Sequence, residues 1–384
     1  MKKNILEKRE KIVILFAGTH LAYSPTILQL YDALSLNNDV TILAHIIPEF
    51  ISQKPTGVNV IYYEEPVWKK PSLLKKIEYF FLRRFHAPAK KMEAAGLKLK
   101  LDYHKFLRVK NLLNNGGYDR IIAVDLENLF YCSLMNRRAD FVSLELKIGE
   151  TFLPFINISL INCVITQTEE RFSYLFKAAN LKTFFVQNAP SFKVITVPQN
   201  KSGLLYGGTA WNPFGFYHCL EYLKKYTDLS LTIQGAIPNE DKNKVIEQYS
   251  SLLSEKLLVI NDEYFNNEEV VNYFSHFKIG ICFYNFEVEW IRHFNYQSAP
   301  SGKIFKYLAA GVPVLAIDIV GFKFIEEFNC GVLIKTLDVE AIRKGVEKIL
   351  VNYQLYEANT KAAAMYFSFD KAIQPYLDYV DRSA

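Results

Sequence analysis

The sequence predicts two α/β domains in tandem, each built around a parallel β-sheet. The chain has 384 residues, more than one domain usually contains. Short apolar runs alternate with helical stretches along its whole length, which is typical of βαβ units. These runs are apolar on both faces, as a sheet covered by helices on both sides requires. Half of the residues are hydrophobic and 22% are charged, which is enough apolar material for two cores.

The N-terminal series begins with an apolar run that we interpret as a buried strand. Ser24-Pro25 then starts a helix, because serine caps helices well and proline suits the first turn. A long basic stretch looks helical, is interrupted near Pro88, and ends at Gly116-Gly117. A further helix is expected at 169–180. The strands are expected at residues 11–17, 39–45, 58–63, 119–125, 140–146, 162–168 and 183–190.

Composition changes at 187–202, where prolines and small polar residues gather, and we place the interdomain linker there. Strands of the second series are expected at 203–208, 229–235, 256–262, 279–285, 312–318 and 331–334. Its helices are expected at 214–226, 241–253, 268–277 and 302–310, with a helical tail from 338. The predicted domains are therefore 1–190 and 202–365, followed by a C-terminal helix, 366–384, for which the N-terminal domain is a candidate packing surface.

Two parallel domains of this kind place a ligand cleft at the carboxyl ends of their strands. Several classes of protein are disfavoured. The five cysteines are scattered and never form a C-x-x-C pair, which argues against a zinc site or a disulfide framework. No run reaches the roughly 20 apolar residues needed to span a bilayer, and the first apolar run is too short for a signal peptide. We expect a cytoplasmic protein.

The basic character of the chain is concentrated in one segment. Residues 69–110 hold 13 Lys/Arg against three acidic residues, a net of +10, whereas the whole chain has a net charge of +5. Leucine, tyrosine and phenylalanine are interleaved with the charges at nearly helical spacing, as in helices that lie on anionic membranes. The alternative is a solvated helix whose aromatic residues face the core. Nucleic-acid binding is disfavoured, because the rest of the chain is acidic and carries no recognition motif.

The stretch 301–334, SGKIFKYLAAGVPVLAIDIVGFKFIEEFNCGVLI, resembles the donor-binding motif of GT-B glycosyltransferases. It is most similar to the retaining bacterial group (family 4-like, group 1) that builds surface polysaccharides. The residues that match are Ser301, Lys303, Tyr307, Leu308, Ala309, Gly311, Pro313, Val314, Gly321 and Gly331. The segments VITQTEERFSYLF, QNAP and GLLYGG resemble further parts of the same fold. The resemblance implies two Rossmann-like parallel-sheet domains that face a central cleft.

The physical chemistry of this stretch fits a diphosphate site. Free N–H groups at the start of a helix attract anions, Gly302 permits a close backbone approach, and Lys303 adds a positive charge. The turn Gly207-Gly208-Thr209 is expected to bring further N–H groups to the same diphosphate. A leaving nucleoside diphosphate develops negative charge, so these groups lie where catalysis needs them. The expected donor-binding residues are Gly207, Gly208, Thr209, Ser301, Gly302, Lys303, Tyr307 and Arg292.

Two positions depart from the resembling family. Its helix carries a glutamate that holds the donor ribose, and Lys306 stands at that position here. Ser298 stands where the partner glutamate would be. Glu287 or Glu289, in the preceding loop, is a candidate replacement, although ordinary solvated acids are the simpler interpretation.

His20, Asp125 and Glu145 are the candidate catalytic residues: His20 lies in the loop after the first predicted strand, and Asp125 and Glu145 lie at the ends of two others, so all three are expected to face the cleft. His20 is a candidate general base for an inverting reaction. Asp125 and Glu145 are candidates for acceptor contact or for helix capping. Arg292 could close over the donor or lie on the surface. No D-x-D pair stands in a suitable loop, so we expect no cofactor and no obligatory metal.

The function implied is transfer of a sugar from a nucleotide-diphosphate sugar to a glycan or lipid-linked acceptor in bacterial surface polysaccharide or lipopolysaccharide biosynthesis. Retention of configuration is slightly favoured. The alternatives are an inverting transferase, a GT-B sugar-nucleotide epimerase or hydrolase, and a non-catalytic module on a degenerate scaffold. The expected partners are the nucleotide sugar, the acceptor and an anionic membrane surface at the inner face of the cell membrane, with no nucleic acid.

Overall fold

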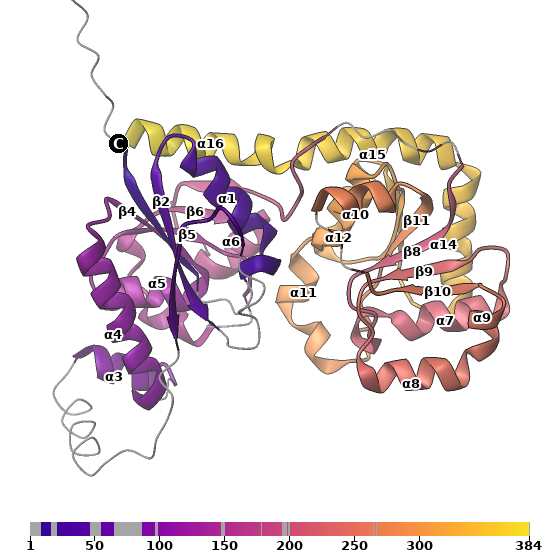
Figure 1. Ribbon diagram of the computed structural model, residues 1–384, viewed down its shortest axis with the longest axis horizontal. Helices are drawn as coiled ribbons and strands as arrows, with labels where there is room; N and C mark the ends of the chain where they lie inside the picture. Colours follow the sequence, from indigo (N-terminus) through magenta and orange to yellow (C-terminus); the bar gives the residue numbers. More distant parts are fainter. Residues whose placement is uncertain are drawn as a thin grey trace, which may run out of the picture. The chain divides into compact units, whose positions relative to one another are not determined.

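The computed structural model consists of two compact units. It describes residues 9–16, 21–46, 55–64, 87–96, 99–146, 150–177, 179–193, 198, 200–263, 265 and 267–383. Unit 1 comprises Met1–Phe185 with Ile373–Ala384, and unit 2 comprises Val186–Ala372. The chain passes from unit 1 to unit 2 just before the QNAP segment, and returns to unit 1 within its last helix (Figure 1).

Unit 1 contains a seven-stranded parallel sheet of order β3-β2-β1-β4-β5-β6-β7. Central strands are buried along nearly their whole length, because helices cover both faces. Its strands are β1 (Lys11–Phe16), β2 (Asp39–Ile46), β3 (Val60–Glu64), β4 (Arg120–Val124), β5 (Ala139–Val142), β6 (Ile161–Thr166) and β7 (Thr183–Phe185). Its helices are η1 (Leu21–Tyr23), α1 (Pro25–Ser35), α3 (Ala87–Ala94), α4 (Leu99–Gly116), α5 (Asp125–Leu134), η3 (Glu150–Phe155), η4 (Ile158–Leu160) and α6 (Glu169–Phe176).

Unit 2 contains a six-stranded parallel sheet of order β10-β9-β8-β11-β12-β13. Its strands are β8 (Ser202–Gly207), β9 (Leu231–Gln234), β10 (Leu258–Asn261), β11 (Phe277–Cys282), β12 (Val314–Ile317) and β13 (Gly331–Ile334). The helices are η5 (Asn212–Phe214), α7 (Phe216–Lys225), α8 (Asn239–Gln248), α9 (Ser250–Ser254), α10 (Asn267–Phe274), η6 (Glu289–Arg292), α11 (Phe294–Ser298), α12 (Gly302–Ala309), η7 (Val320–Phe322), α13 (Phe324–Glu327), α14 (Val339–Val351) and α15 (Tyr353–Phe367). The predicted pair of parallel-sheet α/β domains is thus confirmed.

The order of strands defines where a ligand can bind in each unit. In unit 1 the connections reverse direction between β1 and β4, and in unit 2 between β8 and β11. At such a switch point the loops leave the sheet in opposite directions and open a crevice at the carboxyl ends of the strands. A ligand site is therefore expected at the residues that follow β4 in unit 1, and at those that follow β8 and β11 in unit 2.

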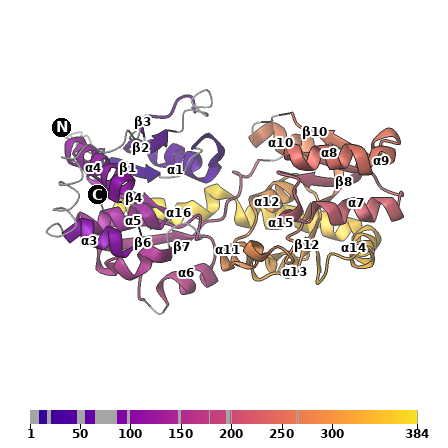
Figure 2. The same ribbon diagram turned by 90° about the horizontal axis from the view of Figure 1, so that it is seen from below.

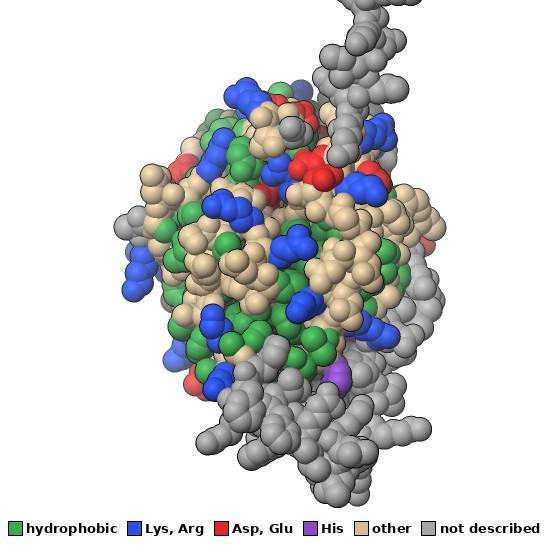
Figure 3. All heavy atoms as spheres, turned by 90° about the vertical axis from the view of Figure 1, so that its left-hand side faces the viewer, with side chains coloured by type: hydrophobic (Ala, Val, Ile, Leu, Met, Phe, Trp, Pro, Cys, Tyr) green, Lys and Arg blue, Asp and Glu red, His purple; other side chains and the backbone are tan. Residues whose placement is uncertain are grey.

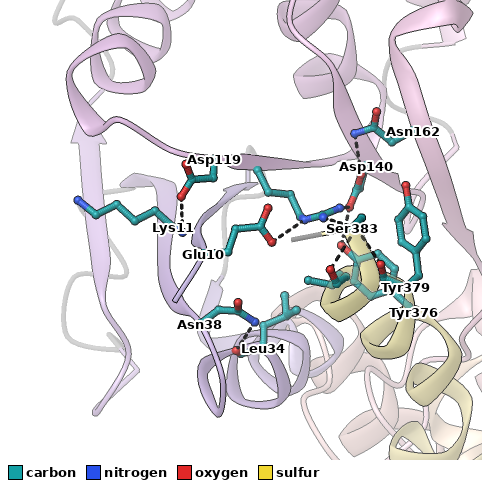
Figure 4. Close-up of polar contacts among 12 residues, drawn as sticks. Glu10, Lys11, Leu34, Asn38, Asp119, Asp140, Asn162, Tyr376, Tyr379 and Ser383 are labelled. Carbon is teal, nitrogen blue, oxygen red and sulfur yellow. Dashed lines mark hydrogen bonds and ion pairs between the residues drawn. The ribbon is translucent and has the colours of Figure 1, made fainter. Parts of the chain in front are cut away.

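The last helix, α16 (Phe369–Ser383), is attached to unit 1 through a buried ion pair. Arg120, at the start of β4, donates to Asp140 at 2.9 Å, to Glu10 at 3.1 Å and to Ser383 of α16 at 2.6 Å. Asp140 also accepts hydrogen bonds from Tyr376 of α16 and from Asn162, and Figure 4 shows these groups converging on the carboxylate. The end of α16 lies beside β1 and β4 (Figure 2).

This network satisfies a carboxylate that is fully buried. Asp140 is 0% exposed, so an unpaired charge there would be very costly. Burial by itself would lower the pKa of Arg120, but the charge and hydrogen bonds of Asp140 raise it above its ordinary value. All five cysteines are also buried, and none forms a disulfide.

Candidate functional site

The candidate donor site lies in unit 2, where helix α12 starts near the β8–β11 switch point. Ser301 is extended (φ −68°, ψ 128°) and precedes the first helical residue, Gly302. A Cβ on Gly302 would lie 2.8 Å from the side-chain amide nitrogen of Asn188 and 3.2 Å from its carbonyl oxygen, so the absence of a Cβ lets the QNAP segment approach closely. Within the described chain, no hydrogen bond occupies the N–H groups of Gly302 and Lys303. The start of α12 therefore offers free donors at the positive end of a helix.

Lys303 supplies a cation that lacks an anionic partner among the described residues. Its ammonium lies 4.7 Å from the ring centroid of Tyr206 and 5.8 Å from that of Phe214. Burial lowers the pKa of Lys303. The thiols of Cys219 and Cys282 are near neighbours, but burial raises the pKa of each, to about 12 for Cys219, so neither is a counterion at neutral pH. A partly buried cation without an ion pair is a natural receptor for a phosphate.

The prediction that the N–H groups of the glycine turn bind the diphosphate is wrong for Gly207 and Gly208. The N–H of Gly207 donates to the Tyr307 hydroxyl at 2.7 Å, and the N–H of Gly208 donates to the Gln234 carbonyl at 2.8 Å. Both donors are therefore used inside the protein, because the turn continues the bonding of the sheet. Gly208 has a left-handed backbone, φ +92°, which favours glycine, and a Cβ there would contact the Lys303 side chain at 3.9 Å. Thr209 is exposed, and no hydrogen bond of the described chain occupies its N–H.

Tyr307 is buried and contacts the backbone of the site rather than its surface. Its side chain is 0% exposed, so its hydroxyl does not face solvent. The hydroxyl accepts the Gly207 N–H and lies 3.1 Å from the Ile281 carbonyl, which joins β8 to β11 at the switch point. Burial raises the pKa of Tyr307 well above its ordinary value, so the hydroxyl keeps the proton that it donates. The structure thus gives Tyr307 a positioning role.

Of the other residues singled out in unit 2, Lys306 lies within α12, where burial lowers its pKa, and the rest lie between β11 and α12. Arg292 is exposed at the end of η6, and its Nε donates to the Phe286 carbonyl at 2.6 Å. Ser298 is 0% exposed and donates to Phe294 within its own helix, so its hydroxyl is occupied. Glu287 and Glu289 are both exposed.

In unit 1, Asp125 follows β4 at the switch point and has a left-handed backbone (φ 60°). Its carboxylate accepts the N–H groups of Leu144 at 2.8 Å and Glu145 at 2.9 Å, and so holds the turn after β5. Burial raises the pKa of Asp125 to about 7, and these two hydrogen bonds oppose the rise. Arg171 is buried and donates to the Leu144 carbonyl at 2.8 Å from the other side.

The structure therefore assigns Asp125 a hydrogen-bonding role that the sequence did not suggest, since its partners lie beyond the next strand rather than in its own helix. Glu145 is exposed beside it. Two buried hydroxyls lie nearby, that of Ser143 just after β5 and that of Thr166 at the end of β6, and neither forms a hydrogen bond with the described residues. His20 lies outside the described residues.

The basic segment 69–110 is described only from residue 87, and its first part lies outside the described residues. In the part that is described, several apolar side chains of α3 and α4 are in the core, among them Met92, Tyr103 and Phe106. Lys90, Lys91 and Arg108 are exposed. Figure 3 shows Lys and Arg side chains spread over one face of unit 1, with few acidic ones in view. Across the described parts of the chain, no helix has the length and apolar character needed to cross a membrane.

Within the described ranges, no three His, Cys, Asp or Glu side chains are grouped so that they could hold a metal ion. The expectation that the chain needs no metal stays a prediction.

Comparison with known proteins identifies the fold. No protein-family model matches the chain, and no curated protein is similar in sequence. Solved structures do match. The pneumococcal O-GlcNAc transferase GtfA, in complex with UDP and GlcNAc, is 10% identical with a TM-score of 0.65, covering 98% of this chain and 99% of that one. Anabaena Alr3699/HepE, in complex with UDP, is 13% identical with a TM-score of 0.65, covering 97% of this chain and 100% of that one.

The apo form of the lipopolysaccharide outer core galactosyltransferase WaaB is also similar. It is 13% identical with a TM-score of 0.59, and the match covers 94% of this chain and 99% of WaaB. GtfA is a sugar transferase and WaaB a galactosyltransferase, and each of the three matches covers nearly the whole of both chains. The protein thus has the GT-B glycosyltransferase fold, as the resemblance of 301–334 predicted.

Proposed function

We propose that this protein is a glycosyltransferase that takes a sugar from a nucleotide-diphosphate sugar. The observation that carries the proposal is the anion site in unit 2: two free N–H groups at the start of α12 beside a lysine without an anionic partner among the described residues. Two similar structures contain UDP, according to their descriptions. In this chain a nucleoside diphosphate would place a phosphate against α12.

The site suits the chemistry of such a transfer. When the bond from the sugar to the diphosphate breaks, negative charge grows on the leaving phosphate oxygen. The N–H groups of Gly302 and Lys303, and the Lys303 ammonium, would stabilise that charge more strongly in the transition state than in the bound donor. We favour retention of configuration, on the likeness of 301–334 to the retaining group. Inversion with His20 as base is the alternative.

We further propose that the acceptor is a glycan or a lipid-linked glycan of a bacterial surface polysaccharide and binds to unit 1. The likeness to a lipopolysaccharide galactosyltransferase and the exposed basic residues of α3 and α4 support this proposal. Because the largest described apolar side chains of these helices, Met92, Tyr103 and Phe106, are in the core, attraction to an anionic membrane would depend on charges such as Lys90, Lys91 and Arg108.

The test uses purified protein with radiolabelled UDP-glucose, UDP-galactose, UDP-GlcNAc and GDP-mannose, with and without bacterial membrane lipid extract. Transfer of label to the lipid or glycan fraction is expected with one donor. Lys303→Ala should abolish this transfer, and the matched control Lys242→Ala, exposed on α8, should not. Turnover of donor without any acceptor would favour an epimerase or hydrolase. Absence of both turnover and binding would favour a degenerate scaffold.

A further inference from the structure

Three aromatic rings adjoin the anion site of unit 2, and we call Trp211, Phe214 and Trp290 the aromatic platform. The Phe214 centroid lies 5.8 Å from the Lys303 ammonium. It also lies 6.2 Å from the ring centroid of Trp211 and 6.2 Å from that of Trp290. The two tryptophan rings are 5.6 Å apart. The platform is thus a compact group of rings that begins beside the cation.

Trp211 is the exposed ring of the platform. Phe214 and Trp290 are partly buried and pack against the core of unit 2. Trp211 is 39% exposed, although tryptophan is the largest apolar side chain. Its ring contacts those of Phe214 and Trp290, and its backbone carbonyl accepts the N–H groups of Phe214 and Phe216. A large exposed ring that contacts Phe214, which lies beside a cation without an anionic partner among the described residues, is typical of a surface that binds a ligand.

Exposed polar residues stand close to the two tryptophans in the chain. Glu287 and Glu289 are exposed on the loop that carries Trp290, and Asn212 is exposed next to Trp211. Carboxylates accept hydrogen bonds from hydroxyl groups, whereas aromatic faces contact CH groups. A pyranose ring offers both, with CH groups on its faces and hydroxyls around its edge. The combination therefore suits a sugar better than it suits an apolar ligand.

We propose that the aromatic platform holds the glycosyl ring of the donor against the face of Trp211, with the loop carboxylates accepting its hydroxyls. This inference rests on the proposed function, since it assumes that the anion site holds the donor diphosphate. The sugar is favoured over the nucleobase because it is bonded directly to the phosphate. A ribose and a second phosphate separate the base from it, and the platform begins 5.8 Å from the phosphate-binding ammonium.

The experiment compares pairs of ligands that differ only in the sugar. Isothermal titration calorimetry measures the affinity of UDP, GDP, ADP and dTDP, and of the glucose conjugate of each, for the full chain. Trp211→Ala should weaken binding of the conjugate about tenfold and leave binding of the matching diphosphate within about twofold. Trp211→Phe should retain most of the affinity. The matched control is Tyr366→Ala, which removes an exposed aromatic ring from α15.

The outcomes separate this inference from the function on which it rests. Wild-type protein that binds none of the eight ligands overturns the proposed function, and the inference with it. If the wild type binds, and Trp211→Ala weakens its affinity for the diphosphate and for the conjugate equally, the inference alone is overturned. The rings would then contact the nucleotide and not the sugar. Unchanged affinity for both also overturns it. Circular dichroism and thermal melting of each variant show whether a loss of binding reflects unfolding.

Discussion

The buried hydroxyl of Tyr307 provides a sharp test of how the donor site is positioned. Tyr307→Phe keeps the ring and removes the oxygen that accepts the Gly207 N–H at 2.7 Å. Because the tyrosine is 0% exposed, no water can replace that oxygen without rearrangement. A buried N–H left unpaired costs about 1–3 kcal/mol. We therefore expect the variant to lose about this amount of free energy of unfolding.

The same substitution should also weaken nucleotide binding, because the turn at Gly207 and Gly208 borders Lys303. Urea denaturation measures the first effect, and calorimetric titration with the preferred nucleoside diphosphate measures the second. The matched control is Tyr376→Phe in unit 1, which removes an equally buried hydroxyl that donates to Asp140. It should lower stability without changing nucleotide affinity. Equal stability of Tyr307→Phe and wild type, or a loss of stability with unchanged affinity, would refute the positioning role.

Three further predictions concern charge. Asp140→Ala should lower the free energy of unfolding by about 3–5 kcal/mol in urea denaturation, because it leaves Arg120 buried without its main partner; a change below about 1 kcal/mol would contradict this. Burial lowers the pKa of Lys303, so as pH rises the nucleotide affinity should fall at a lower pH than it would if this lysine were exposed. The Lys303→Arg variant should keep its nucleotide affinity at about pH 9.5. Burial raises the pKa of Asp125 to about 7, so the folded state keeps a proton that the unfolded state releases, and the resulting stability is lost as pH rises from about 4 to about 7. Asp125→Asn keeps the acceptor oxygen and should gain stability relative to wild type over that window; a constant difference between the two unfolding curves would contradict the assignment.

The sequence predicts the sheets well, because each strand is a short apolar run buried on both faces. It also predicts the start of α12, since Ser301 before Gly302 is a recognisable beginning of a helix. It overextends the strand at 140–146. The observed strand ends at Val142, because Asp125 takes the N–H groups of Leu144 and Glu145 that further pairing would need. That contact joins residues about 20 positions apart, and no local pattern shows it.

Within the site, the glycine turn and the aromatic platform also depend on contacts between residues that are distant in the chain, which no local sequence pattern shows. The sequence indicates a flexible turn at Gly207-Gly208, but the partners of their N–H groups are Tyr307, 100 positions away, and Gln234 on the neighbouring strand. Likewise, Trp211 and Trp290 are distant in the chain and meet only because β8 and β11 are neighbours at the switch point. From its residue type alone, Tyr307 is a candidate for direct contact with the donor. Because its side chain is buried, it instead positions the glycine turn of the donor site.

The most direct test of the central claim is the calorimetric affinity of the wild-type chain and of Lys303→Ala for the same panel of nucleoside diphosphates. The account predicts that the wild type binds at least one diphosphate and that the alanine variant, equally well folded, loses most of that affinity. Binding that is unchanged in Lys303→Ala, or absent from the wild type, would contradict the claim that the start of α12 receives the donor phosphate.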